Sequence, residues 1–404
     1  MDQNRCRERS GGVLGLIAGL LALIVLTGIS GRGWSQELPG RIRLGPVRVQ
    51  PLFSLKEEYS SNYFQTHGDE KGVYTTTMSP GIRLALPLGR NSFQMGWLSD
   101  VQRHSKFQTR LNTDTHTADG ALNLNFPGGL GVGLSDTWRK TFAPPTTETA
   151  QRRDYYGNDT NMAIRYAFAD RWRVELAPVV SQTRYHNNAD RADNVVTAGA
   201  GGTLYYKFLP RTSALVEYRR SHDNTQNREE GDANNYNVNV GLSWDPEGKF
   251  VGTLKGGWGG KSFQNGLSTS TTTVETDVTY NMSSSTAWNL VLNRTISATS
   301  VSQGAAANGP YTVNTGGTLS VKHNVTSRIV ANLNAGFFNN KYPDTDTTGE
   351  KRRDNRFDFG AGVGYRPQEW LGTGLNYTYT DNNSKIKTNS YVDQRVTFYV
   401  AFAY

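Results

Sequence analysis

The sequence lacks most of the features on which other classes of protein depend. One cysteine, Cys6, occurs among 404 residues, and it precedes the long apolar run at the N-terminus. A disulfide scaffold, a thiol nucleophile and a cysteine-ligated metal are therefore excluded for the rest of the chain. Beyond residue 29 no stretch approaches the roughly 20 apolar residues that a membrane-spanning helix needs. A polytopic helical membrane protein is excluded as well.

The first 35 residues have the pattern of a secretory signal peptide. Arginines between residues 5 and 9 precede an apolar run from Val13 to Ile29, and small residues then favour cleavage before Gln36. The alternative is an uncleaved anchor, which the glycines within the run disfavour. We predict a signal peptide over 1–35, a periplasmic N-terminal stub over 36–46 and an outer-membrane β-barrel over 47–404.

The basic excess does not indicate nucleic acid. The 43 Lys and Arg and 35 Asp and Glu leave a net charge of +8 at pH 7, but the cations are scattered singly between acids. A nucleic-acid footprint is normally a clustered basic stripe, and this chain is predicted to be exported. Disorder is excluded too, because aromatic residues make up 11% of the sequence and recur along its length.

The dominant hydrophobic period is two. In the last segment one face is apolar and aromatic, and it comprises Val396, Phe398, Val400, Phe402 and Tyr404. The same alternation recurs over residues 162–168, 172–176, 236–244 and 357–365. A period of two indicates strands with one apolar and one polar face. No segment after the signal shows a helical period over a dozen residues.

Short turns alternate with longer polar connectors. The turns contain Gly, Pro, Asp or Ser and lie at residues 88–91, 127–129, 169–171, 210–211, 245–248, 283–285, 326–328 and 366–368. The connectors are rich in Asn, Thr and Lys and lie at 60–72, 104–112, 143–152, 186–191, 224–234, 263–270, 297–310, 340–353 and 382–390. These connections predict about 18 strands, with both chain ends on the short-turn side.

The pattern favours an all-β fold, a transmembrane antiparallel up-and-down β-barrel, over a soluble sandwich or propeller. The polar face carries charges along the whole chain, aromatic residues gather near strand ends, and turns and loops differ in length. Lipid offers no partner to free backbone groups, so only a closed sheet can span it. We expect outer-membrane lipid as a partner, and the barrel-assembly machinery as another through the C-terminal strand ending at Tyr404.

Two segments resemble the outer-membrane family named putative β-barrel porin 2. The first runs over residues 41–65 and contains Gly45-Pro46 and the sequence Tyr-Ser-Ser-Asn-Tyr-Phe at 59–64; the second covers 79–90. Ser60 stands where the family usually has Asp. The resemblance implies a role in exopolysaccharide export, with polysaccharide and periplasmic export components as partners.

The polar face of such a barrel would line an aqueous lumen. We predict that this lining includes Arg83, Arg139, Arg165, Arg173, Glu175, Glu217, Arg219, Lys255, Glu275, Asp277, Arg356, Asp358 and Arg395. The slight cation excess favours anionic solutes, and the many inward asparagines and tyrosines suit sugars. The alternative is that the charges pair across strands and only keep the lumen wet.

No catalytic, cofactor or metal site is predicted. Ser221, His222 and Asp223 are adjacent, so on one strand they point to alternate faces and cannot form a triad by themselves. An enzyme is not expected, and loops of this length argue against an adhesin. A pore is favoured, as a polysaccharide exporter or as a general diffusion porin with mild anion preference. The sequence does not determine the solute or the oligomeric state.

Overall fold

The computed structural model describes residues 41–144, 152–226, 232–298, 311–345 and 350–404. Eighteen long strands form the wall: β2 (Val47–Ser60), β3 (Val73–Leu88), β4 (Asn91–His104), β5 (Thr113–Asn125), β6 (Leu130–Ala143), β7 (Arg153–Phe168), β8 (Trp172–Tyr185), β9 (Val195–Leu209), β10 (Thr212–Thr225), β11 (Ala233–Trp244), β12 (Phe250–Phe263), β13 (Ser268–Asn281), β14 (Thr286–Ala298), β15 (Tyr311–Asn324), β16 (Ile329–Thr345), β17 (Lys351–Gln368), β18 (Leu371–Ser384) and β19 (Tyr391–Ala403). The short strand β1 (Ile42–Leu44) pairs with the start of β2.

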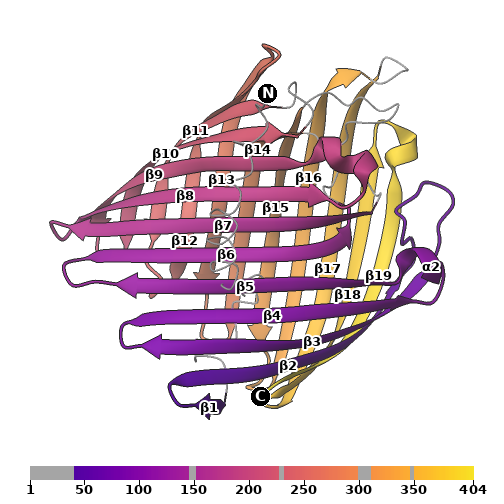
Figure 1. Cartoon of the computed structure of the whole chain (residues 1–404), viewed down its shortest axis with the longest axis horizontal. Coiled ribbons are helices and arrows are strands. Elements are labelled where there is room, and N and C mark those ends of the chain that lie inside the picture. The colour runs from indigo at the N-terminus through magenta and orange to yellow at the C-terminus, as the bar shows by residue number, and fades with distance from the viewer. Residues whose placement is uncertain (1–40, 145–151, 227–231, 299–310, 346–349) are drawn as a thin grey trace, which may run out of the picture.

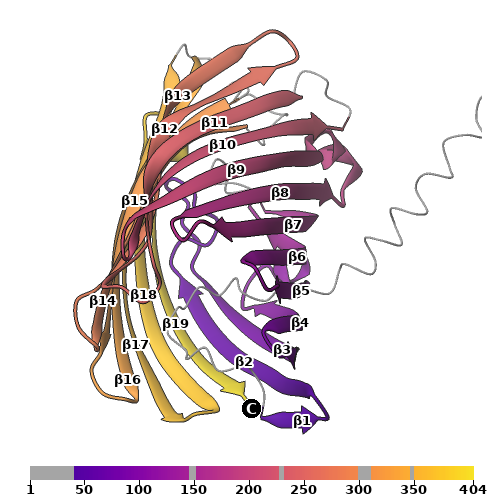
Figure 2. The same cartoon turned by 90° about the vertical axis from the view of Figure 1, so that its left-hand side faces the viewer.

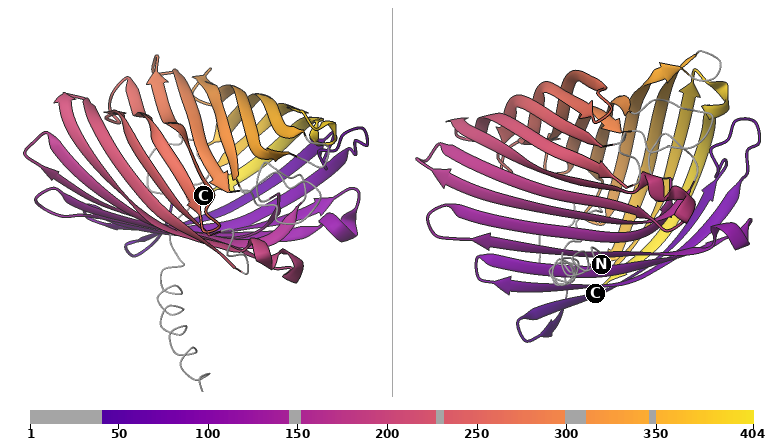
Figure 3. Two further views of the ribbon diagram at one scale, coloured as in Figure 1. Left: turned by 90° about the horizontal axis from the view of Figure 1, so that it is seen from above. Right: turned by 45° about the horizontal axis from the view of Figure 1, so that its top comes forward.

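The wall closes on itself. Each long strand pairs antiparallel with its neighbours in the chain, and β19 pairs with β2 from Arg395–Ser60 to Ala403–Leu52. The indigo β2 and the yellow β19 therefore lie side by side (Figures 1 and 2). Figure 3 shows the curvature of the wall from above. The predicted 18-strand up-and-down barrel is confirmed.

The two faces of the wall differ as the period of two requires. Large apolar side chains are exposed on one face, for example Val240 at 59% and Phe398 at 50%. Their strand neighbours on the other face are polar, and several of these, such as Asn239 and Glu217, are buried. An exposed apolar face around a closed sheet is the surface that such a barrel presents to lipid. We call it the outer face and its opposite the inner face.

Aromatic pairs mark the short-turn end of the outer face. The rings of Trp172 and Tyr206 lie 4.7 Å apart, and those of Phe250 and Tyr280 lie 4.9 Å apart. Further toward the long loops, Trp258 is 48% exposed. Aromatic residues at two levels are typical of the two membrane–water interfaces.

Helical structure is confined to connections. Among the described residues these are α2 (Gln108–Leu111) and the 3₁₀ turns η1 (Asn188–Asp193) and η3 (Lys387–Asn389). In the described ranges, no helix has the length and apolar character needed to cross a membrane. The predicted signal peptide lies outside the described residues, and the domain boundaries stay predictions.

Three predicted connections were misplaced. The connector expected at 340–353 is much shorter, because β16 and β17 take up both of its ends. The turn expected at 366–368 lies within β17, and the reversal falls after Gln368. The register between β17 and β18 shifts between Tyr365 and Gln368, which accommodates Pro367 inside a strand. The connector expected at 263–270 is shorter, because the Ser and Thr residues from Ser268 onward already belong to β13.

One junction in the wall is incomplete. β13 and β14 pair from Asn281–Ala287 to Val274–Arg294, and there the pairing stops. β13 continues to Ser268 along β12, while β14 continues to Ala298 along β15. We call the separated ends, Ser268–Thr273 and Thr295–Ala298, the fork. The β12–β13 hairpin lies at the top of Figure 2, on the long-loop side.

Candidate functional site

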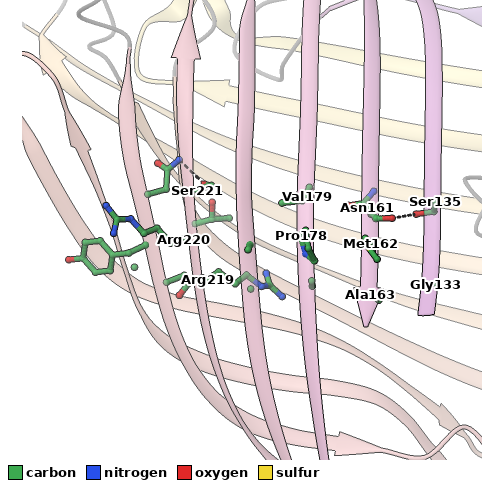
Figure 4. Close-up of a pocket in the computed structure, with 18 of the residues that line it drawn as sticks. Gly133, Ser135, Asn161, Met162, Ala163, Pro178, Val179, Arg219, Arg220 and Ser221 are labelled. Atoms are coloured by element: carbon green, nitrogen blue, oxygen red, sulfur yellow. Dashed lines mark hydrogen bonds between the residues drawn. The ribbon is translucent and has the colours of Figure 1, made fainter. Parts of the chain in front are cut away.

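The inner face encloses a cavity of about 860 Å³. Its lining comes from strands around the wall, with Gln94 on β4, Asn161 on β7, Lys261 on β12 and Thr295 on β14. These four residues lie far apart in the sheet and share one cavity because each belongs to the inner face. Figure 4 shows part of the lining, including Ser135, whose hydroxyl donates to the Asn161 carbonyl oxygen at 3.4 Å. Amide, hydroxyl and glycine positions predominate over large apolar side chains in this part of the wall.

A four-charge network crosses strands β10 to β13. Lys255 Nζ lies 2.8 Å from Glu275 Oε1 and 3.2 Å from Glu217 Oε2. Arg219 bonds the same two carboxylates, with Nη2 at 2.8 Å from Glu217 and Nη1 at 3.0 Å from Glu275. Two cations therefore balance two anions. Lys255 and Glu217 are almost fully buried, so each depends on its partners for solvation.

Polar neighbours extend this network. Asn239 Nδ2 donates to Glu217 Oε1 at 2.9 Å, and Thr273 Oγ1 donates to Asn239 Oδ1 at 2.8 Å. On the adjoining strands Asn289 Nδ2 donates to Asp277 Oδ1 at 2.8 Å. The asparagines predicted to bind sugars thus serve first as partners for the charged groups.

The remaining predicted residues form smaller groups around the same face. Ion pairs join Arg165 to Glu175 at 2.9 Å, Arg356 to Asp358 at 3.0 Å and Arg395 to Asp393 at 2.6 Å, and Arg139 is paired with Asp159. Arg173 lies over the ring of Tyr205 at 3.9 Å, and Arg356 lies over Phe338 at 4.6 Å. The predicted residues therefore form several groups along the wall, and a lumen-lining role for them stays a prediction.

Asp119 is an inner-face carboxylate that is absent from the predicted lining. Asp119 on β5 is 1% exposed, and in the described chain neither of its carboxylate oxygens has a hydrogen-bond partner. Gly96 pairs with both Asp119 and Arg83, which places the two charges on either side of a residue with no side chain. The alternation of Asp119 with Ala118 and Gly120 was the available sequence signal.

The seam between β2 and β19 is held by a buried carboxylate. Asp393 is 1% exposed. Its Oδ1 accepts hydrogen bonds from Ser60 Oγ at 2.8 Å and from the Asn62 backbone N–H at 3.0 Å, and its Oδ2 accepts from Arg395 Nε. The Asn62 side chain also donates to the Val392 carbonyl oxygen at 3.1 Å. The Tyr-Ser-Ser-Asn segment thus ties the first long strand to the last.

A packed cluster covers the long-loop end beside this seam. Tyr63, Val73 and Leu111 are buried together. The Tyr63 hydroxyl lies 2.8 Å from His104 Nε2, and the Arg152 guanidinium lies over the Tyr63 ring at 4.4 Å. Burial raises the pKa of Tyr63, so its hydroxyl stays protonated at physiological pH. The first long loop is therefore anchored to the wall.

The histidine considered for catalysis is separated from its neighbours. His222 Nδ1 lies 3.2 Å from Asn234 Oδ1, whereas Asp223 is paired with Lys261 and Ser221 accepts from Asn235. Alternate facing thus keeps these three side chains out of one triad, as predicted. In the described ranges no group of three or more His, Asp or Glu side chains is placed to hold a metal ion.

A family model described as "Putative beta-barrel porin 2" matches residues 39–404. This chain belongs to that family. The resemblance inferred from residues 41–65 and 79–90 is therefore confirmed, and the protein is an outer-membrane porin-type barrel. No curated protein matches the sequence.

Solved structures with similar folds include, by their titles, an outer membrane protein and an iron transporter. OccAB4 of Acinetobacter baumannii has a TM-score of 0.48 and 10% identity, with 88% of this chain and 98% of that one covered. OpdK of Pseudomonas aeruginosa, solved with vanillate, has a TM-score of 0.46 and 11% identity, with 88% of this chain and 99% of that one covered. The FrpB iron transporter of Neisseria meningitidis has a TM-score of 0.45 and 10% identity, with 83% of this chain covered. This chain spans 62% of the length of FrpB. Likenesses at this level carry no information about the solute.

Proposed function

We propose that this protein is an outer-membrane channel for sugar-containing solutes and that it serves exopolysaccharide export. The observation that carries the proposal is the cavity of about 860 Å³, whose lining is rich in amide and hydroxyl groups. Sugars present many hydroxyls that both donate and accept hydrogen bonds. A lining of Asn, Ser and Thr side chains can exchange such bonds along a path without holding one sugar tightly.

The charge arrangement supports the same solute class. The two cations and two anions of the network around Lys255 balance each other, and Arg165, Arg356 and Arg395 each have a carboxylate partner. A lumen with locally balanced charges imposes a small electrostatic barrier on a polymer. Paired ions also keep such a path hydrated.

The second candidate is a general diffusion porin with mild anion preference. Arg83 and Arg173 favour it, because neither forms an ion pair with a carboxylate in the described part of the chain, whereas most inner-face cations do. Unbalanced guanidinium groups raise the local concentration of anions.

Single-channel recording in planar bilayers tests both candidates. We expect pores whose reversal potential in a KCl gradient indicates mild anion preference, and we expect oligosaccharides of several sugar units to interrupt the current for measurable times. Interruption by neutral and acidic oligosaccharides alike supports a saccharide channel. Pores that conduct ions but ignore oligosaccharides favour the diffusion porin, and strong cation selectivity contradicts both. A deletion strain that still secretes its full polysaccharide would remove the export role.

A further inference from the structure

The fork leaves two strand edges without partners in the wall. Beyond the pair Val274–Arg294, neither Ser268–Thr273 nor Thr295–Ala298 pairs across the junction with another described strand. Each of these edges therefore carries backbone N–H and C=O groups that no ladder satisfies. Such an edge is a template for hydrogen bonding to whatever lies beside it.

The outer face of β13 places the fork at the membrane surface. Toward the short turns this face carries Tyr280, Val278 and Val274, whereas beyond Val274 it carries Thr272, Ser270 and Ser268. Thr272 pairs with Trp258, which belongs to the aromatic level on the long-loop side. Free backbone groups are not tolerated against hydrocarbon. At this level water and polar solutes can reach them.

One side chain spans the fork near its base. Arg294 Nε donates to the Thr272 carbonyl oxygen at 3.1 Å, and Nη2 donates to Thr271 Oγ1 at 2.9 Å. Its Nη1 donates to Thr315 Oγ1 at 2.7 Å on the other side. An arginine therefore bridges the base of the opening, and beyond it no ladder between described strands uses the facing backbone groups.

The cavity on the inner face reaches both sides of the fork. Its lining includes Thr273 of β13 and Lys261 of β12 on one side, and Thr295 and Ile296 of β14 on the other. The lumen and the fork are thus bordered by the same residues. A chain in the cavity can contact the unpaired edges without crossing a paired part of the wall.

We propose that the fork is a side slot that binds the transported saccharide chain as it leaves the lumen. This inference rests on the proposed function. Both edges offer backbone donors and acceptors that no ladder between described strands uses, and the β13 edge adds six consecutive Ser and Thr residues from Ser268 to Thr273. Sugar hydroxyls match both kinds of group, and Arg294 with Lys261 favours acidic sugars. The Lys261 ammonium is paired with Asp223, so its contribution is modest.

A disulfide across the fork tests the slot. If the existing register continued, Thr273 would face Thr295, one step beyond Val274–Arg294. The double variant Thr273→Cys/Thr295→Cys can close the fork on oxidation, because directly opposite positions have the separation that a disulfide needs. Cys6, the one natural cysteine, lies in the predicted signal peptide. The matched control is Val278→Cys/Leu290→Cys, on the outer face of the same two strands where they already pair.

The readout is the duration of current interruptions by an acidic oligosaccharide in planar bilayers. We expect oxidation of the fork pair to shorten them at least tenfold, a reductant to restore them, and the control pair to show no change under either condition. Ion conductance should persist throughout. If the oligosaccharide interrupts the current of the reduced protein and oxidation of the fork pair does not change the durations, the proposed slot is refuted while the proposed function stands. If no form is interrupted by any oligosaccharide, the proposed function itself fails.

Two further arms keep the test decisive. Thr295→Trp fills the fork without requiring a disulfide, and it should shorten the interruptions as the oxidised pair does; unchanged interruptions in this variant overturn the slot. In the other arm, lipopolysaccharide is added to bilayers holding the unmodified protein. If that addition alone abolishes the interruptions, the fork holds lipid-linked sugars, and our assignment of its occupant to the transported chain is wrong.

Discussion

The seam and the fork are the two junctions of long strands with the fewest paired residues, and they are built in opposite ways. The seam joins β2 to β19, strands from the two ends of the chain, yet it is closed by a buried carboxylate and its donors. The fork separates β13 from β14, which are consecutive in the chain. Closure of this barrel therefore depends on side chains placed at each junction and not on closeness in sequence.

The seam and the fork differ because the charged residue at each, Asp393 or Arg294, bonds different groups. Asp393 is 1% exposed and accepts from groups on β2, on the first loop and on its own strand, so it draws the strands together. Arg294 is long and donates to groups on β13 and β15, so it fills a space between strands. The buried carboxylate thus joins strands that pair, whereas the arginine bridges strand ends that do not.

Replacing Asp393 should give the largest effect. Asp393→Ala leaves Arg395 without its carboxylate and leaves Ser60 and the Asn62 N–H without an acceptor. We expect a loss of about 3–5 kcal/mol in the free energy of unfolding, as for a broken buried ion pair. The measurement is urea unfolding in detergent, followed by tryptophan fluorescence and by the mobility of the unboiled protein on gels.

The control for that prediction is an exposed ion pair. Asp114 is paired with Arg103 at 2.9 Å, and its side chain is 51% exposed. Asp114→Ala should cost at most about 1 kcal/mol, because solvent screens such a pair. Equal losses for Asp114 and Asp393 would show that burial at the seam has no special role.

Lys255→Met tests how much the four-charge network across β10 to β13 contributes to stability. Arg219 still bonds both Glu217 and Glu275 in this variant, so the loss should be smaller, about 1.5–3 kcal/mol. The inner face also gains one net negative charge, which should move the reversal potential toward cations. Lys207→Met removes a cation that is paired at 3.5 Å and is 41% exposed, so it should shift selectivity with little loss of stability.

Arg294→Gln probes the fork directly. Its hydrogen bonds lie where water can replace them, so we expect a loss of about 1–2 kcal/mol. Amide hydrogen exchange over Ser268–Thr273 should become faster, while exchange over the paired residues Val274–Asn281 stays slow. Faster exchange over the whole of β13 would mean that Arg294 supports the strand as such, and the fork would lose its distinct character.

The sequence was sufficient for the strands and for most turns because both depend on local chemistry. A period of two and the residues of tight turns act within a few positions, so the alternation over 392–404 predicted β19 and its outer face. Pro367 misled the turn assignment because a register shift can absorb a proline within a strand. Residues 268–270 were predicted as part of a connector because hydroxyl residues lie on both faces of that segment.

The junctions could not be predicted in the same way. The contact between Asp393 and Ser60 joins positions 333 residues apart, and nothing in the pattern around either residue specifies the other. The family motif at 59–64 marked one side of the seam without indicating its partner. How far β13 and β14 pair likewise depends on the whole closed sheet, so the local sequence does not reveal it.

The smallest loss of stability is expected in the packed cluster of Tyr63, Val73 and Leu111 beside the seam. Among the described residues, the fork has no such cluster beside it. Tyr63→Phe removes the 2.8 Å contact with His104 Nε2 but keeps the ring under the Arg152 guanidinium. We expect a loss of about 0.5–1 kcal/mol, the value of one hydrogen bond. Tyr63→Leu also removes the ring and should cost more, since Val73 and Leu111 lose packing. The comparison is made by urea unfolding together with protease cleavage within 65–72. If Tyr63→Phe alone exposes that loop to protease, the hydroxyl and not the ring anchors the loop at the seam.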